Sequence, residues 1–412
     1  MNKRNESGTS RRIHQIERQL DDLTQHDLLR RRRVTSTPCR ASVTVDGRNM
    51  LAFCSNDYLG LADHPALQHA LQEGAALYGV GSGASHLISG HSRAHAQLEE
   101  RLADTQAAYI ENARALYFST GYMANLAVLA GLAAADPGQT AIFSESLNHA
   151  SLIDGTRLAR CAVQVYPHAD VDALESQLRQ SQASTKIVVT DSVFSMDGVI
   201  APVAELTALC ERYDAWLVVD DAHGFGVMGN RGSGILEALN LRSSNLIYMG
   251  TLGKAAGVSG AFIAAHGSVI EWLLQKARTY IYTTASPPAL AHALLTGLDL
   301  VQGEEGMQRR LHLHSLISQF KSAFQATLGN QAGGMTLMAS ATQIQPLLVG
   351  ENQVALRYAA QLFEQGIWVP AIRPPTVPAG TARLRMTLSA GHSSEQVAAL
   401  IQALHGLQKK VA

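Results

Sequence analysis

Four short apolar runs in the middle of the chain constrain its fold more than any other feature. They are KIVVTD at 186–191, AWLVVDD at 215–221, NLIYM at 245–249 and AFIAA at 261–265. Each run is apolar almost throughout instead of alternating with polar residues, which is typical of strands buried on both faces of a parallel sheet. Pro202 opens a helical stretch between the first two runs, since proline suits the first turn of a helix. The pattern predicts an α/β fold with a mostly parallel sheet covered by helices.

Helical patterns flank this region on both sides. Apolar residues spaced three to four apart predict an amphipathic helix from Arg11 that leads into four arginines at 30–33, and further helices at 287–301 and 304–328. Ser393 and Gln396 form a capping-box pattern before a final helix. At 412 residues the chain is long enough for two domains. We expect an N-terminal helix and arm (1–55), a large domain (56–300) and a smaller α+β domain (301–412).

Composition excludes several classes of partner. Lys+Arg 33 against Asp+Glu 34 gives a net charge of -1, so no global field would hold nucleic acid or an anionic membrane. No apolar run approaches the roughly 18 residues of a membrane span, and residues 1–10 contain no apolar signal-peptide core. The four cysteines lie far apart, without metal-ligand spacing. These features predict a cytoplasmic protein.

Polar residues at the ends of the predicted strands are the candidates for a site, because α/β sheets bind ligands beyond the carboxyl ends of their strands. Residues 224–229 (GFGVMG) match the G-x-G-x-x-G dinucleotide fingerprint, which makes a nicotinamide-dependent dehydrogenase the rival hypothesis. The context does not fit it. A further glycine-rich loop follows instead of an apolar helix, and no acidic residue stands about 20 positions later.

Lysine usage gives a stronger indication. The chain has seven lysines, and only Lys254 lies in a small-residue segment (GTLGKAAG, 250–257) at the end of an apolar strand. Burial there would lower its pKa and expose the neutral amine that a Schiff-base lysine requires. The alternative, a phosphate-binding lysine, lacks the Walker pattern because Ala255 replaces Ser or Thr. Asp220 and His223 end the preceding strand and suit either a cofactor ring or a metal ion. We predict no metal site, since no further His or Cys is placed to complete a ligand set.

Together these residues resemble the α-oxoamine synthases, pyridoxal-phosphate enzymes of fold type I. The resemblance runs from Asp27 to His405. It rests on SNDYLG at 55–60, GVGSGASHLISG at 79–90, NHAS at 148–151, VFSMDG at 193–198 and the segments around Asp220 and Lys254. It implies that residues 56–300 bind pyridoxal 5'-phosphate in a large domain of mostly parallel sheet.

The resemblance also implies catalytic roles. Lys254 forms the Schiff base and removes the amino-acid α-proton, while Asp220 keeps the cofactor ring nitrogen protonated. His223 and Ser195 bond the ring hydroxyl, and His149 stacks on the ring. The phosphate is held by backbone donors at a predicted helix start and by hydroxyls, those of Thr283 and Thr284 coming from the neighbouring subunit of a homodimer. These phosphate ligands are Gly121, Tyr122, Thr251, Thr283 and Thr284.

Substrate residues follow from the same resemblance. Residues 372–378 (IRPPTVP) and 381–385 (TARLR) are most similar to members that condense L-alanine with a pimeloyl thioester, on coenzyme A or acyl carrier protein, in biotin biosynthesis. Arg385 corresponds to the amino-acid carboxylate clamp, with Arg383 as the alternative. Arg30, or its neighbour Arg31, and Thr376 correspond to substrate positions, and Asn56 contributes across the dimer interface. A glycine-using 2-amino-3-oxobutyrate ligase is the near alternative.

Overall fold

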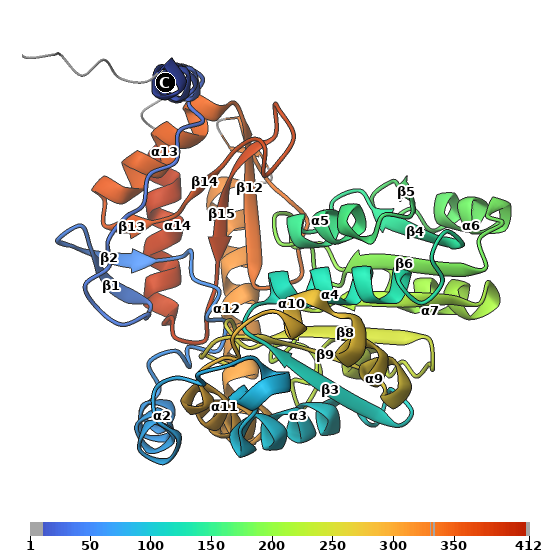
Figure 1. Cartoon of the computed structure of the whole chain (residues 1–412). Helices are drawn as coiled ribbons and strands as arrows, with labels where there is room; N and C mark the ends of the chain where they lie inside the picture. Colours follow the sequence, from blue (N-terminus) through green and yellow to red (C-terminus); the bar gives the residue numbers. More distant parts are fainter. Residues whose placement is uncertain (1–10, 330, 333, 409–412) are drawn as a thin grey trace, which may run out of the picture.

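The structure, a computed structural model, describes residues 11–329, 331–332 and 334–408. The expectation that residues 1–10 contain no signal-peptide core therefore concerns residues outside those described. A seven-stranded sheet forms the centre of the larger part (Figure 1). Its strands, in spatial order, are β3 (Ala113–Phe118), β9 (Ala261–His266), β8 (Leu246–Thr251), β7 (Ala215–Asp220), β6 (Thr185–Asp191), β4 (Thr140–Glu145) and β5 (Ala162–Tyr166).

β9 runs antiparallel to the other six strands of this sheet, which are parallel to one another, so the predicted mostly parallel sheet is confirmed. All four apolar runs are strands of the sheet. Successive residues of a strand enter different cores, as Ile187 and Val189 pack in one cluster and Val188 in the other. A strand buried on both faces has no polar side to alternate with, which explains the continuous apolar runs.

Helices cover both faces of the sheet. One face packs against α4 (Gly121–Ala133), α5 (Ala150–Ala159), α9 (Gly267–Lys276) and α10 (Arg278–Ile281). The other packs against α3 (Arg93–Gln106), α6 (Val171–Gln180), α7 (Val203–Arg212), α8 (Ile235–Leu239) and α11 (Pro288–Gln302), and α2 (Pro65–Tyr78) packs on α11. Pro202 is the N-cap of α7, one position before the first helical residue Val203, and not the first helical residue as predicted.

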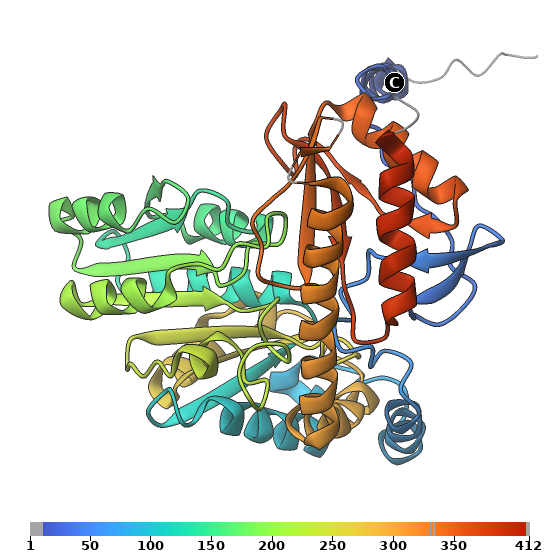
Figure 2. The same ribbon diagram turned by 180° about the vertical axis from the view of Figure 1, so that it is seen from behind.

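The C-terminal part contains a five-stranded sheet. Its order is β10 (Gln331–Ala332), β11 (Met335–Leu337), β12 (Ile344–Gly350), β15 (Ala382–Thr387) and β14 (Ala371–Ile372). The 25-residue helix α12 (Glu304–Leu328) runs along this part, packs against α14 (Ser394–Gln408) and touches α11 (Figure 2). The predicted helices at 287–301 and 304–328 are thus confirmed. Ser393 and Gln396 form both predicted capping-box hydrogen bonds, at 3.0 and 3.3 Å.

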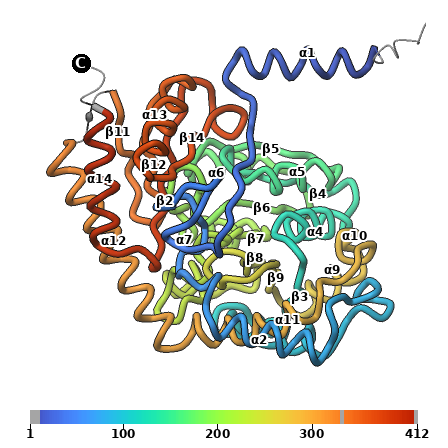
Figure 3. Tube along the Cα trace, turned by 90° about the vertical axis from the view of Figure 1, so that its left-hand side faces the viewer, coloured from blue at the N-terminus to red at the C-terminus, as the bar shows by residue number. Residues whose placement is uncertain are grey.

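The N-terminal arm joins the C-terminal part. Strands β1 (Ser42–Val45) and β2 (Arg48–Ala52) form a hairpin, and β2 pairs in parallel with β13 (Ile367–Trp368), which follows α13 (Asn352–Glu364). The helix α1 (Arg11–Gln25) projects from the rest of the chain (Figure 3), with its apolar stripe exposed. It ends before the arginine run, so the four arginines lie in an extended segment beyond the helix and not in its last turn. Within the described residues no helix is long and apolar enough to cross a membrane.

Candidate active site

The carboxyl ends of the parallel strands bring the chemically active residues together. Asp191 at the end of β6 pairs in register with Asp220 at the end of β7, and Asp220 pairs with Met249 of β8. Lys254 and His149 follow β8 and β4 at the same edge. The parallel strands therefore bring residues that are far apart in the sequence together at one edge of the sheet, where α/β sheets bind their ligands.

Lys254 belongs to a continuous hydrogen-bonded chain. Its Nζ lies 3.0 Å from His223 Nε2, and His223 Nδ1 lies 2.6 Å from the Tyr58 hydroxyl. Tyr58 donates to Asn56 Oδ1 at 3.0 Å. Because the hydroxyl proton goes to Asn56, the consistent tautomer carries the imidazole proton on Nδ1 and leaves Nε2 to accept from the lysine. His223 thus aims the lysine amine.

Burial perturbs this pair in the direction that amine chemistry requires. It lowers the pKa of Lys254 from 10.5 to about 8, against the opposing charge of Asp220. Burial, reinforced by the positive charges of Lys254 and Arg385, lowers the pKa of His223 well below its usual range. His223 is therefore a neutral imidazole near pH 7, and the neutral fraction of Lys254 is far larger than that of an ordinary lysine.

Asp220 is held by groups that the sequence did not single out. Its Oδ2 accepts from Asn125 Nδ2 at 2.7 Å, and its Oδ1 accepts from the backbone N–H of Ala222 at 3.0 Å. Asn125 is fully buried in the apolar helix α4, and it also donates to Ser151 Oγ at 2.9 Å. The only sequence signal was a lone asparagine in an otherwise apolar helix, because a buried amide requires partners.

His149 stands at the N-cap of α5. Its Nδ1 lies 2.7 Å from Ser151 Oγ, which connects it through Asn125 to Asp220. Its backbone N–H donates to Asp191 Oδ2 at 2.7 Å. Burial lowers the pKa of the imidazole, so the ring is neutral near pH 7. A neutral, oriented ring at this edge suits packing against a planar ligand.

The start of α4 provides an anion-binding position. Thr120 caps it by accepting from Met123 N, and in the part of the chain that the structure describes the N–H groups of Gly121 and Tyr122 have no partner. Unpaired N–H groups and the helix dipole favour an anion there. A Cβ on Gly121 would lie 3.0 Å from Thr251 Cγ2, which places Thr251 beside the helix start. The Thr251 hydroxyl donates to Ala222 O at 3.1 Å.

The two candidate arginines have different surroundings. Arg385 donates from Nε to Ser195 O at 2.6 Å and from both terminal nitrogens to Asn56 Oδ1 at 3.4 Å, which joins it to the Lys254 network. Arg383 instead forms a buried ion pair with Asp197. A guanidinium neutralised in this way is not available for a carboxylate, so the geometry favours Arg385 over Arg383 as the substrate clamp.

A cavity of about 720 Å³ adjoins this region. Its lining includes Ser195, Arg383 and the segment around Thr376. The Thr376 side chain is exposed. Arg30 is exposed, and together with burial its positive charge lowers the pKa of Arg373, on the same segment as Thr376. Arg30 is thus near the cavity segment but outside the Lys254 network.

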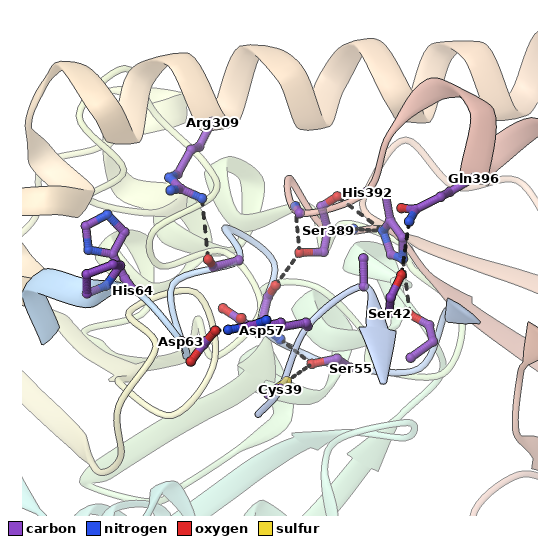
Figure 4. Close-up of a pocket in the computed structure, with 16 residues that line it drawn as sticks. Cys39, Ser42, Ser55, Asp57, Asp63, His64, Arg309, Ser389, His392 and Gln396 are labelled. Atoms are coloured by element: carbon purple, nitrogen blue, oxygen red, sulfur yellow. Dashed lines mark hydrogen bonds and ion pairs between the residues drawn. The ribbon is translucent and has the colours of Figure 1, made fainter. Parts of the chain in front are cut away.

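Three further predicted residues also lie outside that network. The Tyr122 side chain bonds Asp154 of α5, so only its backbone faces the anion position. Thr283 and Thr284 follow α10, half-buried and exposed respectively, and neither side chain hydrogen-bonds another described residue. A separate cavity of about 410 Å³, shown in Figure 4, contains none of the Lys254 network. Its polar groups are largely paired with one another, as Ser389 is with Asp57 O.

The site is built to hold pyridoxal phosphate. The buried amine of Lys254, with its lowered pKa, suits the aldehyde, and the buried carboxylate of Asp220, which has spare acceptor positions, suits the ring nitrogen. The neutral imidazoles suit the ring face, and the unpaired N–H groups at the start of α4 suit the phosphate.

Comparisons with known proteins agree with this geometry. Residues 48–404 match the family model of class I and II aminotransferases. The chain is 63% identical over 395 residues to an 8-amino-7-oxononanoate synthase of Janthinobacterium sp. (strain Marseille), covering 96% of this chain and 98% of that protein. It is 58% identical to one of Bordetella petrii, covering 97% and 98%. The chain therefore belongs to the class I and II aminotransferase family and, within it, to the 8-amino-7-oxononanoate synthases.

Solved structures support the same assignment. An 8-amino-7-oxononanoate synthase of Francisella tularensis has a TM-score of 0.72 and 30% identity, covering 88% of this chain and 98% of that one. A serine palmitoyltransferase of Sphingomonas wittichii has a TM-score of 0.86 and 26% identity, covering 96% and 97%. The predicted fold class, the acyltransferase activity and the pyridoxal-phosphate cofactor are thus confirmed.

Proposed function

We propose that the protein condenses L-alanine with a pimeloyl thioester, releasing CO₂ and the free thiol and forming 8-amino-7-oxononanoate for biotin biosynthesis. The observation that carries the proposal is the pairing of Lys254 Nζ with His223 Nε2 at 3.0 Å, beside the held carboxylate of Asp220. Family membership supports the reaction type, and the relatives named above support the substrates. The chemistry needs a proton removed at the amino-acid α-carbon and later returned.

Bound pyridoxal phosphate supplies an electron sink that stabilises a carbanion at that carbon. Lys254 binds the cofactor and then moves the α-proton, for which a pKa of about 8 is close to the working pH. His223 positions Lys254 Nζ, and Tyr58 fixes the tautomer of His223. Asp220, fixed by Asn125, would supply the negative charge that keeps the ring nitrogen of the bound cofactor protonated.

Arg385 is our candidate for the alanine carboxylate, because its guanidinium is buried and its partners Asn56 and Ser195 are neutral. Its charge has no carboxylate partner among the described residues. The cavity beside Thr376 is our candidate for the acyl chain, with Arg30 and Arg373 as cations for the terminal carboxylate or the phosphates of the donor.

We also propose that the enzyme acts as a homodimer in the cytoplasm. Thr283 and Thr284 make no side-chain hydrogen bonds within the described chain, and the neighbouring Tyr282 is 71% exposed. An exposed aromatic beside unpaired hydroxyls suits a subunit interface, where those hydroxyls would reach the partner's phosphate. The four free cysteines fit a reducing compartment.

A four-way assay tests the reaction. The purified holoenzyme is given alanine or glycine, each with pimeloyl or acetyl thioester, and CO₂ and thiol release are measured. We expect turnover with alanine and the pimeloyl thioester. Preference for glycine with the acetyl thioester would instead identify a 2-amino-3-oxobutyrate ligase. Lys254→Ala is the control, since it should abolish both turnover and the yellow cofactor absorbance. Running pimeloyl-coenzyme A against pimeloyl-carrier protein identifies the donor.

A further inference from the structure

Three histidines outside the catalytic network form a compact group, which we call the histidine cluster: His86, His91 and His95. One ligand atom from each lies within 4.8 Å of the others. His86 belongs to a single helical turn at His86–Gly90, His91 follows it, and His95 is in the first turn of α3. The cluster is separate from His149 and His223, the histidines of the Lys254 network.

The rings of His86 and His91 face each other through their Nδ1 atoms. His86 Nδ1 and His91 Nδ1 are 3.0 Å apart. His95 Nδ1 lies 3.0 Å from both the N–H and the Oγ of Ser92, the residue next to His91. The ring centroids are 5.0–5.7 Å apart in all three pairs.

A backbone carbonyl outside the cluster holds His95 by its other nitrogen, and a carboxyl group lies near the other nitrogen of His91. His95 Nε2 lies 2.9 Å from the carbonyl oxygen of Ser286, and His91 Nε2 lies 3.9 Å from Glu99 Oε2. Metal-binding histidines characteristically direct their second nitrogen to a backbone carbonyl or a carboxylate, which fixes the tautomer and leaves the first nitrogen free to ligate. For His95 the Ser286 carbonyl is such a partner, and its Nδ1 accepts from the N–H of Ser92, a hydrogen bond that an ion at this nitrogen would replace.

One side of the histidine cluster is open to solvent. His86 and His95 are buried, whereas His91 is exposed and gives an ion access from solvent.

We propose that the histidine cluster binds one divalent transition-metal ion of the Zn²⁺ and Co²⁺ class through the three imidazoles. Two nitrogens 3.0 Å apart, each about 2.05 Å from one ion, subtend an angle of about 94° at the ion, within reach of tetrahedral coordination after a small opening. Water or the Ser92 hydroxyl completes the fourth position. Three nitrogen ligands without a carboxylate select Zn²⁺ and Co²⁺ over Mg²⁺ or Ca²⁺.

An ion at this position connects two segments. His86 stacks on Tyr280 of α10 with ring centroids 4.6 Å apart, and His95 bonds Ser286. The segment between them contains Thr283 and Thr284. Binding is therefore expected to raise the melting temperature of the holoenzyme, since an ion that binds only the folded state stabilises it.

Cobalt titration tests the site directly. Holoenzyme freed of metal by a chelator is titrated with Co²⁺, whose visible ligand-field bands lie at longer wavelength than the cofactor absorbance. Zn²⁺ is then added as a competitor. We expect one Co²⁺ per chain with the intense bands of a tetrahedral site, displaced by Zn²⁺, and affinity reduced at least tenfold in His91→Ala and His86→Ala. His69→Ala removes an exposed histidine from α2 outside the cluster and should bind as the unchanged protein does.

Three results would overturn the proposal: no stoichiometric Co²⁺ binding, equal affinity in His91→Ala, or an equal loss in His69→Ala. His91→Ala alters an exposed side chain and is expected to fold, which circular dichroism and retained cofactor absorbance would show. Activity is not needed for the readout, so failure of this proposal and failure of the proposed reaction are distinguishable.

Discussion

The lowered pKa of Lys254 makes the capture of pyridoxal phosphate by cofactor-free protein strongly dependent on pH. Only the neutral amine attacks an aldehyde. With a pKa of about 8, about one lysine in eleven is neutral at pH 7, compared with about one in three thousand at the ordinary value of 10.5. The capture rate should therefore rise about tenfold from pH 6 to pH 7 and level off above pH 8.

The charged neighbours of Lys254 predict in which direction the pKa of Lys254 moves when each of them is removed. Asp220 raises the pKa of Lys254 by its negative charge, and Arg385 lowers it by its positive charge. Asp220→Asn should therefore move the midpoint of the rate profile to lower pH, while Arg385→Gln should move it to higher pH. The two shifts have opposite signs, so a general loss of structure cannot mimic both.

Stopped-flow absorbance of the bound cofactor measures the capture rate across pH. The Lys254→Ala variant measures any reaction of the other six lysines with the cofactor, which is then subtracted. A simple alkylamine gives the pH profile of an unperturbed amine. A midpoint near pH 10, or shifts of equal sign in the two variants, would refute the account of burial and charge given above.

The remaining predictions concern positioning and stability. Asn125→Ala removes a charge-assisted bond to Asp220 worth about 1.5–3 kcal/mol, so kcat/KM should fall about ten- to hundredfold in steady-state assays while the fold persists. Arg383→Ala breaks the buried pair with Asp197 and should lower the free energy of unfolding by about 3–5 kcal/mol in urea titrations. Arg385→Gln should instead raise the KM for alanine; an unchanged KM would remove Arg385 from the carboxylate role.

Local patterns were sufficient for the elements of the fold. A strand buried on both faces is recognised by a continuous apolar run, as at 186–191. A capping box is recognised by two residues three positions apart, as at Ser393 and Gln396. Both patterns involve only residues close together in the chain. The helix α1 was also predicted, but its exposed apolar stripe was not, because amphipathic spacing indicates which residues share a face and not whether another element covers that face.

Motifs singled out the principal candidate residues, since Asp220 ends β7 and His223 and Lys254 closely follow the ends of β7 and β8, where α/β sheets bind ligands. The sequence favoured Arg385 as the carboxylate clamp and left Arg383, two residues away on the same face of β15, as the alternative. The position of Asp197, almost two hundred residues earlier, separated them by neutralising Arg383.

Asn125 and the histidine cluster needed the tertiary structure for the same reason. A buried amide or imidazole acquires its role from partners that long-range packing supplies, as Asp220 does for Asn125 and Ser286 for His95. The sequence by itself therefore determined the elements, the cofactor chemistry and the family, all of which depend on local pattern. The fold decided which charges are paired, which are free and which nitrogens converge, because these depend on distances between residues remote in the chain.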